Sequence, residues 1–189
     1  MIVTALVLAA GRSTRMGESN KLTLDLDGKP LLCHAVDTLL ATSVDEIHVV
    51  TGHEADSVRA CLAGRRVSFV HNPDYASGMA SSIAAGIRTV ANADAILLCL
   101  GDMPDLPANV VEALIAAFDT ADAIVLPVCD GRRGHPVLFG AAHFASLEKL
   151  SGDRGARDLL DRGDVRIVEV ATDQIGVHRD VDTPRDLGR

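Results

Sequence analysis

The stretch LVLAAGRSTRMGESNKL (residues 6–22) decides the fold, because an unbroken apolar run ends there in a basic loop that contains glycine. The apolar run covers residues 3–8, and such runs are typical of strands buried on both faces of a parallel sheet. The loop after it carries Arg12, Arg15 and Lys21. Glycine and clustered cations directly after a buried strand indicate a phosphate site.

Two familiar phosphate-binding loops do not match this stretch. A P-loop needs a lysine directly after its second glycine, whereas Gly17 is followed by Glu18. The dinucleotide fingerprint needs a second glycine two residues after the first, whereas Gly11 is followed by Arg12 and Ser13. The loop is therefore a nucleotide loop of another kind or a simple turn, which glycine also favours. Because the chain has only three lysines, Lys21 is a better ligand candidate than an average surface lysine.

Outward from this stretch, short apolar runs alternate with segments of helical periodicity. We predict strands at residues 3–8, 47–50, 67–70, 95–100, 123–128 and 165–170, and helices at 30–40, 55–62, 78–90, 107–118, 141–149 and 154–160. The alternation predicts one α/β domain over residues 1–189, with a doubly wound, mostly parallel sheet. Ser77 is the expected cap of the helix at 78–90. Asp130-Gly131 predicts a hairpin, and with it a small antiparallel addition at one end of the sheet.

Composition narrows the class of partner. The net charge of −8 argues against a nucleic-acid partner, which requires a basic face. No apolar run is long enough to span a membrane, and the N-terminal residues lack the basic lead of a signal peptide. The four cysteines form no CxxC pair and are expected to be free thiols in a reducing compartment. These features predict a cytoplasmic protein with no membrane partner.

Three carboxylates are candidate metal ligands. Ligands of doubly wound sheets bind at the carboxyl ends of the strands, and LLCLGDMP (97–104) places Asp102 at such an end. Magnesium is usually held by one or two carboxylates together with phosphate oxygens. RDVDTPRDL (179–187) adds Asp180 and Asp182. The alternative is that Asp102 caps a turn and that Asp182-Thr183-Pro184 starts a helix.

Six segments resemble, in order and over nearly the whole chain, the nucleotidyltransferases that build molybdenum cofactor dinucleotides. They are LAAGRSTRMGESNKL, NPDYASGMASSIAAGI, GDMP, DGRRGHPVLF, SGDRGARDLL and DVDTPRDL. The resemblance, which is strongest to the cytidylyl-transferring members, implies a Rossmann-like nucleotidyltransferase fold. It also implies Mg²⁺-dependent transfer of CMP from CTP to the terminal phosphate of molybdopterin, with release of pyrophosphate.

The resemblance also implies roles for individual residues. Arg12, Lys21 and Asp102 would be catalytic, and Asp102 would hold the metal with Asp180 or Asp182. The nucleotide would contact Ala9, Ala10, Gly11, Arg12, Lys21, Gly78, Ser81, Ser82 and Asp102, three of which start a predicted helix whose N-terminus attracts anions. The pterin substrate would contact Arg133, Gly134, His135, Arg154 and Arg157.

The base and the acceptor are separate questions. Guanylyl-transferring relatives carry LAGG where this chain has LAAG, so Ala10 favours CTP over GTP. Guanylyl transfer to the same cofactor and cytidylyl transfer to a sugar or alcohol phosphate stay open. A carrier that binds the finished cofactor and passes it to a molybdenum hydroxylase is an alternative of another class. Under either reading a hydroxylase is the expected recipient, but a carrier has no need of paired acids for magnesium.

Overall fold

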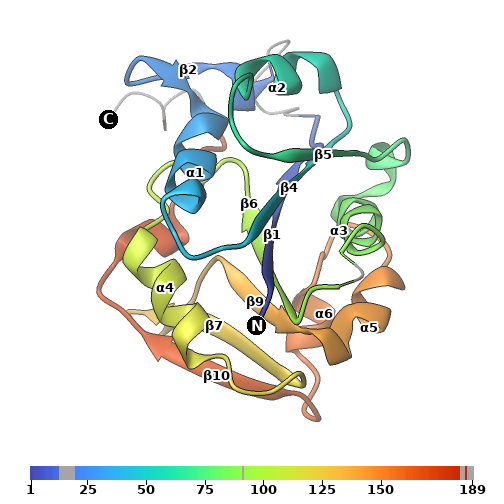
Figure 1. Ribbon diagram of the computed structural model, residues 1–189, viewed down its shortest axis with the longest axis vertical. Coiled ribbons are helices and arrows are strands. Elements are labelled where there is room, and N and C mark those ends of the chain that lie inside the picture. The colour runs from blue at the N-terminus through green and yellow to red at the C-terminus, as the bar shows by residue number, and fades with distance from the viewer. Residues whose placement is uncertain (13–19, 91, 184–185, 187–189) are drawn as a thin grey trace.

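A computed structural model of the protein describes residues 1–12, 20–90, 92–183 and 186, and its centre is a twisted sheet (Figure 1). In the described residues this sheet has eight strands in the order β10-β7-β9-β6-β1-β4-β5, with β8 paired to β7. The strands are β1 (Val3–Ala9), β4 (Glu46–Thr51), β5 (Ser68–His71), β6 (Ala95–Leu100), β7 (Ala123–Cys129), β8 (Arg132–Arg133), β9 (Val137–Gly140) and β10 (Arg166–Ala171). A separate hairpin pairs β2 (Asp25–Leu26) with β3 (Lys29–Pro30).

Helices cover both faces of the sheet, as the alternating sequence predicts. They are α1 (Leu31–Leu40), α2 (Ala55–Cys61), α3 (Met79–Ile87), α4 (Ala108–Ala117), α5 (Phe144–Glu148) and α6 (Arg157–Leu160). Short 3₁₀ turns are η2 (Lys21–Thr23), η3 (Tyr75–Ser77), η4 (Ala141–His143) and η5 (Ile175–His178). Figure 1 shows α1 and α4 on one side of the central strands and α3, α5 and α6 on the other.

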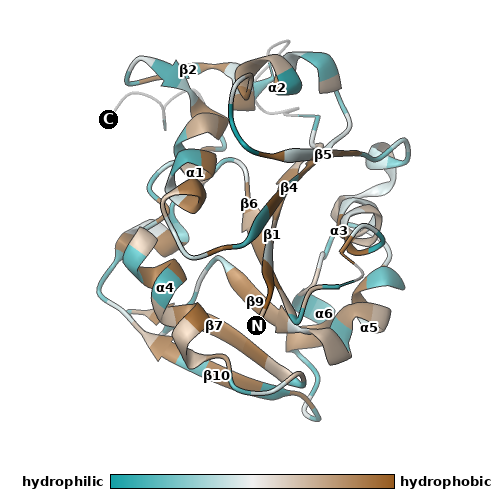
Figure 2. Ribbon diagram, in the orientation of Figure 1, coloured by the Kyte–Doolittle hydropathy of each residue, from teal (hydrophilic) through white to brown (hydrophobic). Residues whose placement is uncertain are grey.

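The core is split between these two faces because side chains alternate along each strand. On β1, Val3, Ala5 and Val7 pack in the cluster that contains α1, α2 and α4. Leu6 packs in the opposite cluster, with residues of α3, α5 and α6. Figure 2 shows the matching concentration of hydrophobic residues along the sheet strands and the inner sides of the helices. The prediction of a doubly wound, mostly parallel sheet in one α/β domain is confirmed.

The predicted antiparallel addition is present, but it does not lie at one end of the sheet. β9 lies inside the sheet, antiparallel to both β6 and β7, rather than at one end. All four residues of β9 are buried, which suits a central strand with neighbours on both sides. The hairpin at Asp130-Gly131 does form: both residues have positive φ, of 51° and 72°, and β8 returns antiparallel to β7.

The start of α3 also differs from the prediction. Gly78, not Ser77, is its N-cap residue, and Ser77 ends η3 with its hydroxyl donating to the carbonyl of Asp74 at 2.7 Å. Gly78 has a φ of 115°, where a β-carbon is strained. A β-carbon there would also lie 2.5 Å from Asp153 Oδ1, so only glycine allows the loop around residue 153 to approach the helix start.

Across the described residues, the helices are all too short or too polar to cross a lipid bilayer.

Candidate active site

Lys21 reaches from the end of the first loop to the carboxylate that follows β6. It begins η2, whose cap is Asn20; the side chain of Asn20 accepts a hydrogen bond from the backbone N–H of Leu22 at 3.1 Å. Lys21 Nζ donates to Asp102 Oδ2 at 2.6 Å. β1 and β6 are parallel neighbours, so the residues after them meet at the same edge of the sheet. The contact therefore joins residues 81 positions apart at the place where such sheets bind ligands.

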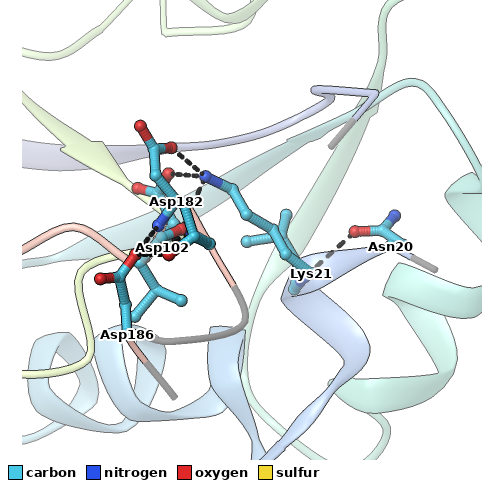
Figure 3. Close-up of polar contacts among 8 residues, drawn as sticks. Asn20, Lys21, Asp102, Asp182 and Asp186 are labelled. Atoms are coloured by element: carbon cyan, nitrogen blue, oxygen red, sulfur yellow. Dashed lines mark hydrogen bonds and ion pairs between the residues drawn. The ribbon is translucent and has the colours of Figure 1, made fainter. Parts of the chain in front are cut away.

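The C-terminal segment meets the same lysine. The backbone N–H of Val181 donates to the carbonyl of Asp102 at 3.0 Å. Lys21 Nζ donates in turn to the carbonyl of Val181 at 2.9 Å and to Asp182 Oδ1 at 3.0 Å. Figure 3 shows the ammonium of Lys21 pointing toward the carboxylates of Asp102 and Asp182. Three segments that are distant in sequence thus converge on one cation.

Close backbone packing holds η5, the turn that precedes Asp180 and Asp182, in place. A β-carbon on Gly176 would lie 2.1 Å from the carbonyl oxygen of Asp105, and one on Gly134 would lie 2.7 Å from the carbonyl oxygen of Val177. The backbone N–H of His135 donates to that Val177 carbonyl at 2.9 Å. η5 is therefore clamped between the loop after β6 and the loop before β9, and this clamp fixes the approach of the following aspartates.

The three predicted metal ligands are brought together. Asp102, Asp180 and Asp182 can each offer one carboxylate oxygen, and these oxygens lie within 4.8 Å of one another. Asp102 Oδ1 is buried, and no hydrogen-bond donor contacts it among the described residues. A buried carboxylate oxygen without a donor is costly unless a cation or water satisfies it. The donor set of hard oxygens therefore fits Mg²⁺ or Mn²⁺.

Burial and charge act against each other in this cluster. Burial raises the pKa of Asp102; the Lys21 ammonium opposes this shift and the Asp180 carboxylate adds to it. Burial alone would lower the pKa of Lys21, but the charges and hydrogen bonds of Asp102 and Asp182 outweigh it and hold that pKa above its ordinary value. Lys21 is therefore a firmly charged ammonium among carboxylates.

The helix start expected to contact the nucleotide has its hydroxyls engaged internally. Asn72 follows β5 and donates from Nδ2 to Ser81 Oγ at 2.9 Å and to Ser82 Oγ at 3.0 Å. Ser81 Oγ also donates to the carbonyl of Gly78 at 2.8 Å, and Ser82 is buried. Asn72 thus ties the end of β5 to the first turn of α3. Backbone N–H groups of this turn are engaged as well: Ala80 donates to the carbonyl of Gly152 at 3.1 Å and Ser81 to the carbonyl of Gly78 at 3.2 Å.

The first loop starts at the same edge. Ala9 and Ala10 are buried, whereas Gly11 and Arg12 are exposed. The carbonyl of Ala10 accepts a hydrogen bond from the backbone N–H of His53 at 3.2 Å. The β-carbon of Ala10 lies 3.0 Å from where a β-carbon on Gly52 would be, so it packs inward. Arg15 lies outside the described residues.

The residues expected near the pterin fall into two groups. Arg133 pairs with Glu169 at 2.9 Å, and Arg154 pairs with Asp158 and Asp161; both arginines are exposed. Within the part of the chain that the structure describes, neither of them contacts the carboxylate cluster.

His135 and Arg157 form the second group, and His135 interacts electrostatically with both Arg157 and Asp180. The pKa of His135 is lowered to about 4, chiefly by burial and also by the charge of Arg157, while Asp180 opposes the shift. His135 Nδ1 is buried without a hydrogen-bond partner among the described residues. His135 is therefore a neutral ring within electrostatic range of Arg157 and of Asp180, one of the candidate metal ligands.

Three supporting residues were not assigned from the sequence: Asn20, Asn72 and Gly176. Asn20 precedes a short turn and has the side chain of a cap, which is a local signal. Asn72 directly follows β5, and a position at the carboxyl end of a strand is also a signal that the sequence carries. Gly176 has no local signal, because its role depends on the approach of Asp105 from another loop.

A doubly wound sheet with a lysine and three carboxylates at its carboxyl edge is an arrangement suited to nucleotidyl transfer. The chain belongs to the family described as the MobA-like NTP transferase domain, whose model matches residues 5–167. The protein is accordingly a nucleotidyltransferase.

Individual relatives within this fold carry different names. The chain is 33% identical to Nicotine blue oxidoreductase of Paenarthrobacter nicotinovorans, across 99% of this chain and 95% of that protein. It is 28% identical to the Molybdenum cofactor cytidylyltransferase of Escherichia coli strain K12, across 98% of this chain and 93% of that one. The structure is similar to Rv0371c of Mycobacterium tuberculosis H37Rv in complex with manganese, with a TM-score of 0.86, 29% identity, and coverage of 100% and 97% of the two chains.

Proposed function

We propose that this protein transfers CMP from CTP to the terminal phosphate of molybdopterin and forms molybdopterin cytosine dinucleotide. The observation that carries the proposal is the convergence of Lys21, Asp102 and Asp182, with contacts of 2.6 and 3.0 Å, at the carboxyl edge of the sheet. The similarity to Molybdenum cofactor cytidylyltransferase along 98% of the chain supports this choice of substrates.

The reaction requires positioning rather than a strong base. A phosphate monoester is already anionic at neutral pH, so its oxygen can bond to the α-phosphorus of CTP directly. The bond from that phosphorus to the bridging oxygen of the β-phosphate breaks, and pyrophosphate leaves. The obstacles are repulsion between the two anions and the charge that builds on the leaving group.

The residues of the site address both obstacles. Lys21 and Arg12 would bind the triphosphate, and their charge would stabilise the departing pyrophosphate. Asp102, with Asp180 and Asp182, would hold Mg²⁺ or Mn²⁺, which when bound neutralises phosphate charge. The positive end of the α3 helix dipole would attract an anionic part of a substrate.

The acceptor side rests on the residues around His135. The neutral ring of His135 and the cation of Arg157 would face the pterin and its phosphate, beside Gly134. Arg133 and Arg154 have acidic partners and would have to exchange them to bind the substrate. We also propose that the product passes to a molybdenum hydroxylase.

The experiment is a pyrophosphate-release assay with each of CTP, GTP, ATP and UTP, with molybdopterin and with Mg²⁺ or Mn²⁺. Release with CTP that depends on molybdopterin is the expected result. Preferential release with GTP would assign guanylyl transfer instead, and release only with a sugar phosphate or alcohol phosphate in place of molybdopterin would change the acceptor. The proposal is falsified if no nucleotide is turned over, and binding of the finished dinucleotide without turnover would identify a carrier.

The similarity to Nicotine blue oxidoreductase makes an oxidation or reduction of nicotine blue a second candidate. Such a reaction has no evident use for a lysine among three carboxylates, so the site favours nucleotidyl transfer. An assay that follows the conversion of nicotine blue, run beside the pyrophosphate-release assay, separates the two candidates directly.

A further inference from the structure

Lys21 occupies the place where the proposed metal site carries its negative charge. Its ammonium contacts one oxygen of Asp102 and one of Asp182, at 2.6 and 3.0 Å, and the carbonyl of Val181 at 2.9 Å. Figure 3 shows these contacts on one side of the ammonium. Two of the three candidate metal ligands are thus already paired with a cation of the protein itself.

We propose that Lys21 is a stand-in cation, which holds the carboxylates of Asp102 and Asp182 in the nucleotide-free protein and opposes metal binding until a triphosphate draws it away. The inference rests on the proposed function for its assignment of the metal and triphosphate to this edge. It goes beyond that function in making Lys21 a switch between two partners, rather than a permanent ligand of phosphate.

Lys21 should weaken metal binding whichever carboxylate oxygens the metal uses. If the metal uses the oxygens that Lys21 contacts, the two cations compete for them. If it uses Asp102 Oδ1, which lacks a donor among the described residues, an ammonium on the other oxygen of the same carboxylate repels it. The lysine is largely buried, with its side chain 14% exposed, so water and salt screen this repulsion only weakly.

A bound triphosphate would shift the competition for the carboxylates from Lys21 to the metal. Its oxygens attract the long, mobile lysine side chain as a point charge, and they also offer ligands to the metal. The cluster would then lose its internal cation at the moment when the metal gains phosphate oxygens. By linkage, nucleotide and metal would each raise the affinity for the other.

The test is a titration of nucleotide-free protein with Mn²⁺, followed by the electron paramagnetic resonance signal of the free ion. Lys21→Met should raise Mn²⁺ affinity by about fivefold or more, the lower end of ordinary site-to-site coupling. Lys21→Gln, which removes the charge but keeps a polar hydrogen-bond donor, should also raise the Mn²⁺ affinity. Asp102→Asn should remove the tight binding and so define the site against weak binding elsewhere on an acidic surface.

Lys29→Met is the matched control. Lys29 pairs with Asp37 at 2.7 Å, and its loss lowers the total charge of the protein by the same amount. Its Mn²⁺ affinity should stay within about twofold of wild type, since a solvated charge at a distance is screened. Far-UV circular dichroism checks that each variant is folded.

Unchanged or weaker Mn²⁺ binding in both neutral variants of Lys21 would overturn the inference, as would an equal gain in Lys29→Met. These titrations contain neither CTP nor molybdopterin. The two proposals can therefore fail independently. The Mn²⁺ titrations test the role of Lys21, and the pyrophosphate-release assay tests the proposed function.

Discussion

At the scale of single residues, Asp102 has a carboxylate whose pKa is raised by burial, with one oxygen on Lys21 and the other without a donor among the described residues. An acid whose pKa is higher in the folded than in the unfolded protein costs folding free energy once the pH exceeds its unfolded pKa. Its presence is therefore better explained by function than by stability.

Asp102→Asn should lower pyrophosphate release by about 100-fold or more, because the charge that holds the metal is lost. The thermal midpoint should stay within about 4 °C of wild type, since the substitution also removes a buried charge and Lys21 keeps Asp182 as a partner. Rates and melting curves are measured beside Asp164→Asn, which changes an exposed aspartate and should leave both unchanged. A large loss of stability with little loss of rate would contradict this role.

Ala10 is the residue on which the choice of base was predicted to depend. Because its methyl group packs inward beside Gly52, it can act on a base only through the shape of the loop that begins at Gly11. Ala10→Gly should raise kcat/KM for GTP relative to CTP by about tenfold at most, because packing without hydrogen bonds discriminates modestly. Paired assays with the two nucleotides measure this ratio, and an unchanged ratio would remove Ala10 from the specificity.

At the scale of elements, the clamp that two loops form around η5 positions the aspartates that follow it. Its position depends on two close backbone approaches, of Gly176 to Asp105 and of Val177 to Gly134. The side chain of Arg179 adds an ion pair with Asp105 at 3.0 Å. Asp180 and Asp182 are thus placed by packing that lies several residues away from them.

Gly176→Ala should move this clamp, because the added methyl would lie 2.1 Å from the Asp105 carbonyl oxygen. We expect a loss of about 1–3 kcal/mol in the free energy of unfolding and a fall of about tenfold or more in pyrophosphate release, since misplaced ligands are costly. Gly163→Ala is the control, as a β-carbon there has no atom within 4 Å and the change should stay within about 0.5 kcal/mol. Similar effects in the two variants would show that the clamp does not place the site.

At the scale of the whole molecule, the two halves of the core pack on opposite faces of one sheet. The candidate site joins the loop after the first strand to the segment that holds Asp180 and Asp182. A cation bound there should stabilise the entire domain. Mn²⁺ or Mg²⁺ at about 100 times its dissociation constant should add about 2.7 kcal/mol to the free energy of unfolding. Calorimetry should show one transition that shifts upward with metal, and the shift should vanish in Asp102→Asn.

Much of the fold is readable in the sequence because buried parallel strands are unbroken apolar runs. The predicted strand at residues 95–100 coincides with β6, and that at residues 3–8 differs from β1 by one residue. The antiparallel addition was expected at one end of the sheet, but β9 lies between β6 and β7, because strand order depends on pairing that no local pattern encodes. Gly78 rather than Ser77 is the N-cap residue of α3, because the close approach of the loop around Asp153 requires glycine at residue 78.

The candidate site, like the fold, has features that the sequence predicts and features that only the tertiary structure determines. The sequence by itself determined the alternation of strands and helices, and it placed Lys21 and Asp102 after strands and Asp180 and Asp182 near the C-terminus, because hydrophobic periodicity and residue chemistry are local properties. Only the tertiary structure decided that the ammonium of Lys21 rests on two of those carboxylates and that η5 holds them there. The physical reason is that charge pairing and close backbone contact depend on distances between segments up to 161 residues apart, which folding alone sets.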